Sequence, residues 1–464
     1  MPTPSSARNR KPASTARQIL RLAIPAFGAL IAEPLFLLAD SAIVGHLGVP
    51  ELAGLGLAST LLQTAVGLMV FLAYSTTATV ARYIGAGRMK DALAVGRDGL
   101  WLAVILGVVL ATAGWILAPP VARLMGADGA VLDFAVEYLR FSMPGLVAML
   151  LVLAATGILR GQQDTRTPLV VATVGFGANI VLNFALVYGL NMSVAGAALG
   201  TSIAQWGMAA VYLRIVVRAA REHQVSLAPD WPGIRAVSRV GSWLMLRTLS
   251  LRIAFLATVF VATSQGAVSL AAHQLVMTMF TFLAFALDAL AIAAQALIGK
   301  ELGAGIPEAA AGQDGRNPAQ RTVHTLTRTM IIWGLGFGAV AGAIVAALAP
   351  FLGQLFSPDP QVQAAFAAGM LVLAVGQPIA GYVFVLDGVL IGAGDARYLA
   401  LAGVVNLLIY LPMLWWVYSA SLTGGVGIAW LWAAFGIGYL AARALTLGWR
   451  VRDDRWMVVG ASRD

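Results

Sequence analysis

The chain has 464 residues, of which 59% are hydrophobic and only 11% are Asp, Glu, Lys or Arg. Soluble domains carry about a quarter of their residues as charged side chains, so this chain has too little charge to coat a water-soluble surface of its size. The net charge of +9 does not indicate a nucleic-acid partner, because the basic residues are dispersed at the ends of apolar runs and form no patch. The composition therefore predicts an integral membrane protein whose main partner is the lipid bilayer.

The apolar runs predict an all-α protein with about twelve membrane-spanning helices. A helix needs roughly 20 apolar residues to cross a bilayer, and runs of this length recur along the whole chain. The N-terminal residues are basic and polar and lack the apolar region of a signal peptide, so we expect a cytoplasmic tail at 1–17. The predicted spans are 18–46, 51–82, 92–118, 131–160, 168–190, 194–218, 236–264, 268–298, 322–350, 362–391, 396–418 and 424–448.

The distribution of positive charge predicts the orientation in the membrane. Most of the 30 Lys and Arg residues fall in the N-terminal tail, in the loops that follow even-numbered spans, and in the C-terminal tail. Cytoplasmic loops of membrane proteins carry such an excess of Lys and Arg. We therefore expect a multi-pass protein of the cell (plasma or inner) membrane with both termini in the cytoplasm.

The two halves of the chain are similar to each other, which indicates an internal repeat. One register of the repeat places Gly48 on Gly266, and a second register, which applies after about residue 90, places Asp164 on Asp395. Six spans per half is an even number, so both halves enter the membrane in the same orientation, as parallel repeats do. The predicted organisation is an N-lobe at 18–218, a cytoplasmic linker at 219–235, a C-lobe at 236–450 and a cytoplasmic tail at 451–464.

The first predicted span carries the most informative polar residues. Charged side chains inside a bilayer are costly and are usually functional or paired. Asp40 and Glu33 are seven residues apart and share one helical face. We interpret Asp40 as a candidate proton carrier, with a structural carboxylate as the alternative, and Glu33 as equally suited to either role. Pro25 and Pro34 interrupt the helix and free backbone carbonyls, which predicts a hinge or a polar pocket.

Two further groups of polar residues lie inside predicted spans. Asn179 and Asn183 are four residues apart on one face of the fifth predicted span, where they either complete the coupling site or hydrogen-bond between helices. In the second half, opposite charges at similar depth predict a buried ion pair or a substrate site. These charges are Arg247, Arg252, Asp288 and Asp387.

Motifs for catalysis and nucleotide binding are absent from the sequence. It contains no GxxxxGK[ST], HExxH or GxSxG pattern. The chain also has no Cys, which excludes disulfides and thiolate metal sites. We therefore expect no enzyme activity, no cofactor and no bound metal.

Residues 33–48 read EPLFLLADSAIVGHLG. This segment resembles the first span of multidrug and toxic compound extrusion (MATE) transporters, in their DinF-like branch. The resemblance extends over nearly the whole chain. The other segments that carry it are 84–87, 160–165, 271–274, 287–291 and 387–395.

The resemblance implies a V-shaped pair of six-helix lobes that exchanges a small organic, often cationic, compound for H⁺ or Na⁺ by alternating access. Asp40 matches the coupling carboxylate of the first span in this family, and Asp387 matches a carboxylate of the tenth. Asn183 stands about where some archaeal relatives carry a second carboxylate. Arg247 and Arg252 occupy the seventh span, where the NorM branch has a carboxylate. We therefore favour proton coupling through Asp40, with sodium as the alternative.

The leading hypothesis is an exporter of small organic molecules that works as a monomer. The alternative is a flippase for a lipid-linked precursor, which shares the two-lobed architecture. A flippase is expected to line its central cavity with several cations that hold a diphosphate, and only Arg247 and Arg252 qualify in this sequence.

Overall fold

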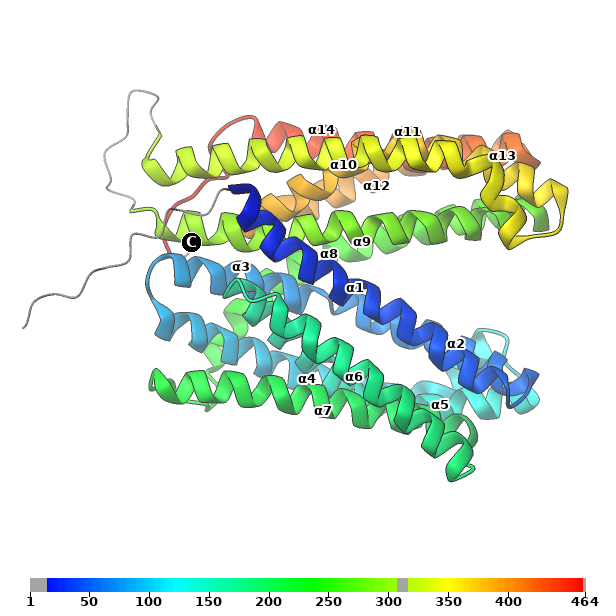
Figure 1. The fold of residues 1–464 in the computed structure, drawn as a ribbon, viewed down its shortest axis with the longest axis horizontal. Coiled ribbons are helices and arrows are strands. Elements are labelled where there is room, and N and C mark those ends of the chain that lie inside the picture. The colour runs from blue at the N-terminus through cyan, green and yellow to red at the C-terminus, as the bar shows by residue number, and fades with distance from the viewer. Residues whose placement is uncertain (1–14, 307–315, 462–464) are drawn as a thin grey trace, which may run out of the picture.

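A computed structural model describes residues 15–306 and 316–461 (Figure 1). Most of the predicted tail at 1–17 and the last residues of the tail at 451–464 lie outside the described residues. Within these ranges the regular structure is entirely helical, which confirms the predicted fold class. The elements are α1 (Thr15–Gly45), α2 (Val49–Leu68), α3 (Phe71–Gly85), α4 (Met89–Leu124), α5 (Gly129–Gly161), α6 (Arg166–Phe184), η1 (Ala185–Gly189), α7 (Ser193–Glu222), α8 (Trp231–Ser264), α9 (Ala267–Ala304), α10 (Pro318–Phe356), α11 (Pro360–Gly392), α12 (Ala396–Ser419), α13 (Gly424–Trp432), η2 (Ala433–Tyr439) and α14 (Leu440–Val451).

The described residues agree with the prediction of about twelve spans. Eleven helical segments, from Val49–Gly85 to Gly424–Val451, are long and apolar enough to cross a membrane, and the 31-residue α1 precedes them. The helices extend beyond the apolar runs because backbone hydrogen bonding continues into the polar residues outside the bilayer. For the same reason only 223–230 separates α7 from α8, a shorter connection than the linker predicted at 219–235.

Three of these segments are interrupted. A break at Met69 and Val70 separates α2 from α3 within one span. The π-helix η1 continues α6, and the π-helix η2 joins α13 to α14. Single π-helical turns inside longer helices are frequent at functional sites, and both π-helices lie next to the polar groups described below.

Helices α1–α7 and α8–α14 form two bundles, the N-lobe and the C-lobe, arranged as a V (Figure 1). The ribbons converge at the end where α3 and α9 finish and where the C-terminal segment 452–461 lies. We call this the terminal end, and the opposite end, where the ribbons diverge, the open end.

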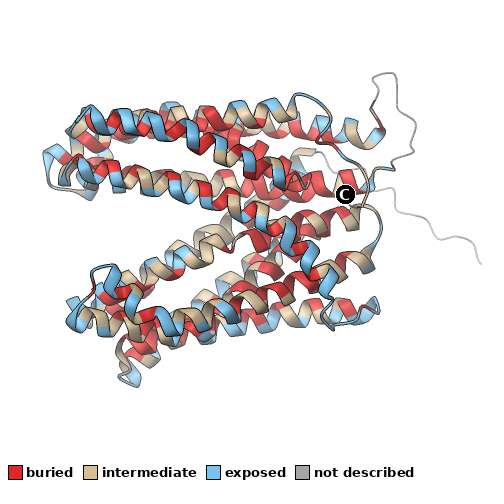
Figure 2. Ribbon diagram, turned by 180° about the vertical axis from the view of Figure 1, so that it is seen from behind, coloured by how far each residue is buried: buried red, intermediate tan, exposed pale blue. Residues whose placement is uncertain are grey.

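The hydrophobic cores follow the same division. At the terminal end one core includes residues of both lobes, among them Leu72 and Ile158 of the N-lobe and Ile298 and Val389 of the C-lobe. Toward the open end the N-lobe has a core of its own, and the C-lobe has another. Buried residues accordingly line the junction of the bundles at the terminal end (Figure 2). Among the described residues, the core that the lobes share therefore lies at the terminal end.

The internal repeat is visible where α3 meets α9. A Cβ atom on Gly85 would overlap the backbone of Lys300, and a Cβ atom on Gly303 would overlap the backbone of Arg82. The register that places Gly48 on Gly266 also pairs Gly85 with Gly303 and Arg82 with Lys300. The two contacts are therefore one contact repeated about a pseudo-two-fold axis, and glycine is needed at both positions for the backbones to meet.

The C-terminal segment crosses this junction. Trp456 and Met457 are buried in the shared core. The buried guanidinium of Arg82 on α3 donates hydrogen bonds to the carbonyls of Val458 at 2.6 Å and Ala393 at 2.9 Å. Arg82 thus connects the N-lobe to two separate parts of the C-terminal half.

Candidate functional site

A polar site in the N-lobe is centred on Asp40 of α1, which is 3% exposed. Asn183 of α6 donates a hydrogen bond from Nδ2 to Asp40 Oδ1. The hydroxyl of Tyr138 on α5 donates to Asp40 Oδ2 at a longer 3.4 Å. Among the described residues no Lys or Arg forms an ion pair with Asp40. The carboxylate is therefore held by neutral donors from two other helices.

The hydrogen bonds continue away from Asp40. Asn183 Nδ2 also donates to Asn179 Oδ1 at 2.9 Å, and Asn179 Nδ2 donates to Thr201 Oγ1 on α7 at 3.0 Å. The remaining acceptor of the Asn183 amide, Oδ1, is buried and has no partner among the described residues. The π-helix η1 begins two residues after Asn183. The site therefore has one acceptor still open beside the carboxylate.

The structure brings together three of the predicted N-lobe residues, namely Asp40, Asn179 and Asn183. The side chain of Glu33 lies outside the described residues. Pro25 and Pro34 both lie inside the continuous helix α1, and their role as a hinge stays a prediction. Sequence reasoning missed Tyr138 and Thr201, because a neutral hydroxyl inside a membrane helix is common and gives no distinctive signal.

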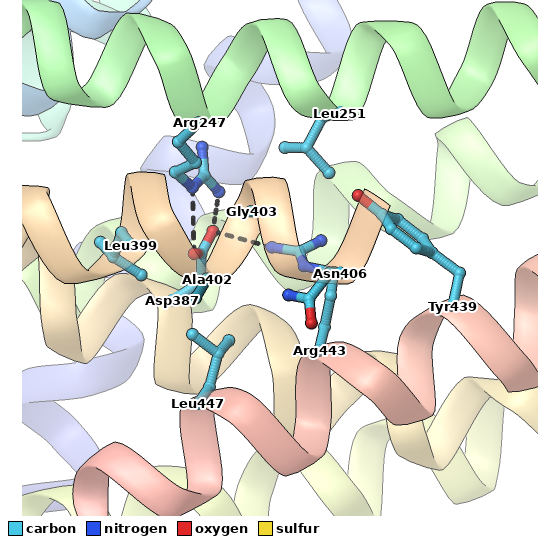
Figure 3. A pocket seen from close by; sticks show the side chains of 10 residues that line it. All are labelled: Arg247, Leu251, Asp387, Leu399, Ala402, Gly403, Asn406, Tyr439, Arg443 and Leu447. Carbon is cyan, nitrogen blue, oxygen red and sulfur yellow. Dashed lines mark hydrogen bonds and ion pairs between the residues drawn. The ribbon is translucent and has the colours of Figure 1, made fainter. Parts of the chain in front are cut away.

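The second polar site lies in the C-lobe and is charged (Figure 3). The carboxylate of Asp387 on α11 lies between the guanidinium groups of Arg247 on α8 and Arg443 on α14. Arg247 contacts both carboxylate oxygens, with Nε at 3.1 Å from Oδ1. Arg443 is 3.4 Å from Oδ2. One carboxylate thus forms ion pairs with two guanidinium groups.

These three residues line a small pocket between α8, α11, α12 and the η2–α14 segment. Asn406 of α12 and Tyr439 of η2 line the same pocket (Figure 3). Arg247 also faces the N-lobe, because its Cζ atom lies 5.9 Å from the centre of the Tyr74 ring on α3. Arg247 therefore contacts both the pocket of the C-lobe and the N-lobe.

Of the four predicted C-lobe charges, the structure pairs Arg247 with Asp387 and leaves the other two apart. Arg252 is exposed and forms no ion pair with a described residue, although its guanidinium lies against Gly67 of α2. Asp288 is partly buried, lies within electrostatic range of Arg160 and Arg247, and has no hydrogen bond to a described residue. Sequence reasoning missed Arg443, although it falls inside the predicted span 424–448. In the described ranges no three His, Cys, Asp or Glu side chains cluster as metal ligands.

A model of the MatE family matches residues 25–185 and 244–416, one block in each lobe. The matched residues amount to more than half of the chain. This chain belongs to the MATE family of multidrug efflux transporters. It is therefore a transporter and not an enzyme, and the flippase alternative is not favoured.

The relatives of this MATE transporter include bacterial and plant proteins. It is 29% identical over 460 residues to Protein DETOXIFICATION 44, chloroplastic, of Arabidopsis thaliana, in a match that covers 95% of this chain and 84% of that protein. It is 32% identical over 250 residues, about half of each chain, to DNA damage-inducible protein F of Escherichia coli K12. The crystal structure of the Vibrio cholerae MATE transporter VcmN in its bent form has a TM-score of 0.83 and 21% identity, with coverage of 96% of this chain and 98% of that one. At this identity the structural likeness shows the fold alone.

Proposed function

We propose that this MATE transporter exports small organic compounds in exchange for protons, and that Asp40 takes up and releases the exchanged proton. The observation that carries this proposal is the surroundings of Asp40, where an amide and a hydroxyl group donate hydrogen bonds and no described Lys or Arg supplies a counter-charge. A buried carboxylate that no cation balances is neutralised when it binds a proton. Proton binding therefore changes the charge of the N-lobe interior.

Asn183 is suited to both forms of Asp40. Its Nδ2 group donates to the carboxylate, as an amide donor must when the carboxylate is charged. A protonated carboxyl group is itself a donor, and the buried Oδ1 of Asn183, which has no partner among the described residues, can accept from it after rotation of the amide. The same side chain can then donate to the charged carboxylate and accept from the protonated one.

The arrangement of the cores supports alternating access. The lobes have separate cores toward the open end and one common core at the terminal end. Closing the open end and opening the terminal end would move the lobes as rigid bodies, without unpacking either of the cores near the open end. We further propose that the terminal end faces the cytoplasm of the cell membrane, because Lys and Arg are concentrated in the loops on that side.

Transport measured in proteoliposomes tests this function. An imposed pH gradient should drive accumulation of a panel of small organic compounds by the wild-type protein, whereas a sodium gradient alone should not. Asp40→Asn should abolish the gradient-driven component. Asp133→Asn provides the matched control, because it makes the same change on an exposed part of α5. Sodium-driven transport that needs Asp40 would make Na⁺ the coupling ion, and wild-type transport by Asp40→Asn would remove Asp40 from the mechanism.

Reporter tags test the orientation. Tags at the N-terminus and at the C-terminus should both report a cytoplasmic location, and a tag in the loop between α4 and α5 should report the opposite side. Termini on opposite sides of the membrane would contradict the even number of spans.

A further inference from the structure

The C-terminal segment 452–461 is attached to the C-lobe along most of its length. It leaves α14 and runs to the ends of α9 and α3 (Figure 1). Trp456 is 1% exposed and lies in the shared core, and Arg316 donates two hydrogen bonds to the carboxylate of Asp454, at 2.6 and 3.1 Å. Two further hydrogen bonds join the segment to the C-lobe, from Gln320 Nε2 to the Met457 carbonyl at 3.1 Å and from the Gly460 N–H to the Leu302 carbonyl at 2.9 Å. The segment therefore belongs to the C-lobe.

The end of the same segment is bound by one side chain of the N-lobe. Arg82 of α3 is 3% exposed, and its Nη2 atom donates hydrogen bonds to the carbonyls of Val458 at 2.6 Å and Gly460 at 3.1 Å. Its Nε atom also donates to the Gly460 carbonyl, at 3.3 Å. Hydrogen bonds from a charged donor are stronger than those between neutral groups. Arg82 therefore ties the segment to the opposite lobe.

The connection between α7 and α8 (223–230) is the counterpart of this segment in the internal repeat. The second register of the repeat pairs the first residue of α7 with the first residue of α13, and it places 223–230 on 454–461. Val225 packs in a small core made of N-lobe residues, whereas its counterpart Trp456 lies in the core that both lobes share. The two counterparts therefore pack in different places.

The backbone carbonyls of the two counterparts also have different partners. Leu227 accepts a hydrogen bond from Trp101 Nε1 on α4, in its own lobe, at 3.0 Å. The second register pairs Leu227 with Val458, and the Val458 carbonyl accepts from Arg82 of the opposite lobe. The first repeat thus uses this carbonyl within one lobe, and the second repeat uses it to join the two lobes.

We propose that the C-terminal segment is a strap that holds the terminal end closed, because it carries the carbonyls of Val458 and Gly460 from the C-lobe to Arg82. The lobes can separate at this end only after Arg82 releases these two carbonyls, while the hydrogen bonds of the segment to α9 and α10 remain. The strap therefore sets the ratio between conformations that are open and closed at the terminal end. This inference rests on the proposed alternating access, and it involves neither Asp40 nor the exchanged ion.

Spin labels across the terminal end measure this ratio in the full chain. The chain has no Cys, so Lys90→Cys and Thr325→Cys, at exposed positions near the starts of α4 and α10, provide one label in each lobe. Gly460→Val is the main variant. Gly460 has a φ of +107°, which a side chain strains, so valine should displace the carbonyl from Arg82. The ratio of long to short distances should rise about tenfold, the usual effect of losing one hydrogen bond to a charged group.

Two further variants accompany Gly460→Val. Gly336→Val is the matched control, because it makes the same change at an exposed position of α10 where a Cβ atom meets no other residue within 4 Å, and it should keep the wild-type distances. Trp456→Ala removes the side chain that holds the strap in the shared core and should raise the ratio as Gly460→Val does. Thermal unfolding of each preparation shows that it is folded. A folded Gly460→Val protein with wild-type distances would overturn the proposal.

A double variant tests whether the strap acts through Arg82. Arg82→Met/Gly460→Val should have the same ratio of distances as Arg82→Met alone, because both changes remove the same contact. A further rise by the full factor seen for Gly460→Val alone would show that the strap does not act through Arg82, and would overturn the assignment. Wild-type transport by Asp40→Asn would reject the proposed role of Asp40, but the response of the distances to Gly460→Val should persist in that variant.

Discussion

The two lobes share one backbone plan, but each carries a different polar site. The register that pairs Gly48 with Gly266 places Asp40 on Thr258, and the register that pairs Asp164 with Asp395 places Asp387 on Thr156. Each threonine hydrogen-bonds to a tyrosine in its own lobe, Thr258 to Tyr410 at 2.7 Å and Thr156 to Tyr212 at 3.4 Å. At each of these repeat-related positions, one lobe has a charged side chain and the other lobe has a threonine that pairs with a neutral tyrosine.

The partners of these residues follow the repeat as well. In the second register, which pairs Asp164 with Asp395, Tyr410 is the counterpart of Asn179, and Tyr212 is the counterpart of Arg443. The contact of Asp387 with Arg443 is therefore repeated by Thr156 and Tyr212 with different chemistry. The contact of Thr258 with Tyr410 has a less direct counterpart, because Asn183 lies between Asp40 and Asn179. The comparison indicates that the described residues form one site of each kind, a neutral shell around Asp40 and a cationic shell around Asp387. The variants below test this difference.

The largest expected effect is the loss of coupling in Asp40→Asn. Asparagine retains an oxygen that accepts from Asn183 and has no proton to exchange at physiological pH, so pH-driven export should stop. The free energy of unfolding should change by less than about 1 kcal/mol, because no ion pair is broken. Transport in proteoliposomes and thermal unfolding of the same preparation measure the two effects. A variant that is strongly destabilised would show that the charge of Asp40 has a structural role.

The corresponding change in the C-lobe should affect stability first. Asp387→Asn removes the carboxylate that lies between two guanidinium groups, and breaking a buried ion pair typically costs about 3–5 kcal/mol. The double variant Asp387→Asn/Arg443→Met should recover part of this loss, since one cation fewer remains unpaired. Thermal unfolding in detergent measures both. If Asp387→Asn is as stable as the wild type, the guanidinium groups are solvated and the contrast between the lobes fails.

The spans and several site residues could be predicted from two features of the sequence, the long apolar runs and the rare polar residues inside them. The spans followed from apolar runs, and Asp40, Asn183, Arg247 and Asp387 stood out because polar groups are rare at membrane depth. Arg443 did not stand out, because it lies near the basic end of the last span and resembles a residue that sets topology.

Other features depend on contacts between segments distant in sequence. Arg82 lies beside a loop, and its role depends on carbonyl groups of residues near the other end of the chain. The π-helices η1 and η2 arise from a change in backbone hydrogen bonding that hydropathy does not register. The sequence therefore indicates which residues are costly to bury, and it does not indicate which neutral groups surround them.

A smaller effect is expected at the junction of the lobes. Arg82→Met removes charge-assisted hydrogen bonds to Val458 and Ala393 and should cost about 2 kcal/mol or more. These bonds exist only while the terminal end is closed. The variant should therefore populate, more than the wild type does, conformations in which the lobes separate at the terminal end and approach each other at the open end. The chain has no Cys, so spin labels on Cys pairs introduced at Ala130 and Gln361 can report the distance across the open end. An unchanged distance distribution would show that Arg82 does not control the conformation. Arg239→Met controls for the loss of an arginine.

The smallest effect should come from the neutral pair that replaces the Asp40 site in the C-lobe. Thr258 and Tyr410 are both fully buried, and Thr258→Val keeps the shape of the side chain while it removes the hydroxyl group. The Tyr410 hydroxyl then loses its partner, which should lower the free energy of unfolding by about 1 kcal/mol. Because no charge or proton is exchanged at this position, pH-driven export by the folded protein should equal that of the wild type. The measurement is transport per mole of folded protein, with Asp40→Asn reconstituted in parallel. Equal export would confine coupling to the N-lobe, whereas a loss of pH dependence in Thr258→Val would mean that both lobes take part in coupling and that the neutral pair is more than a packing contact.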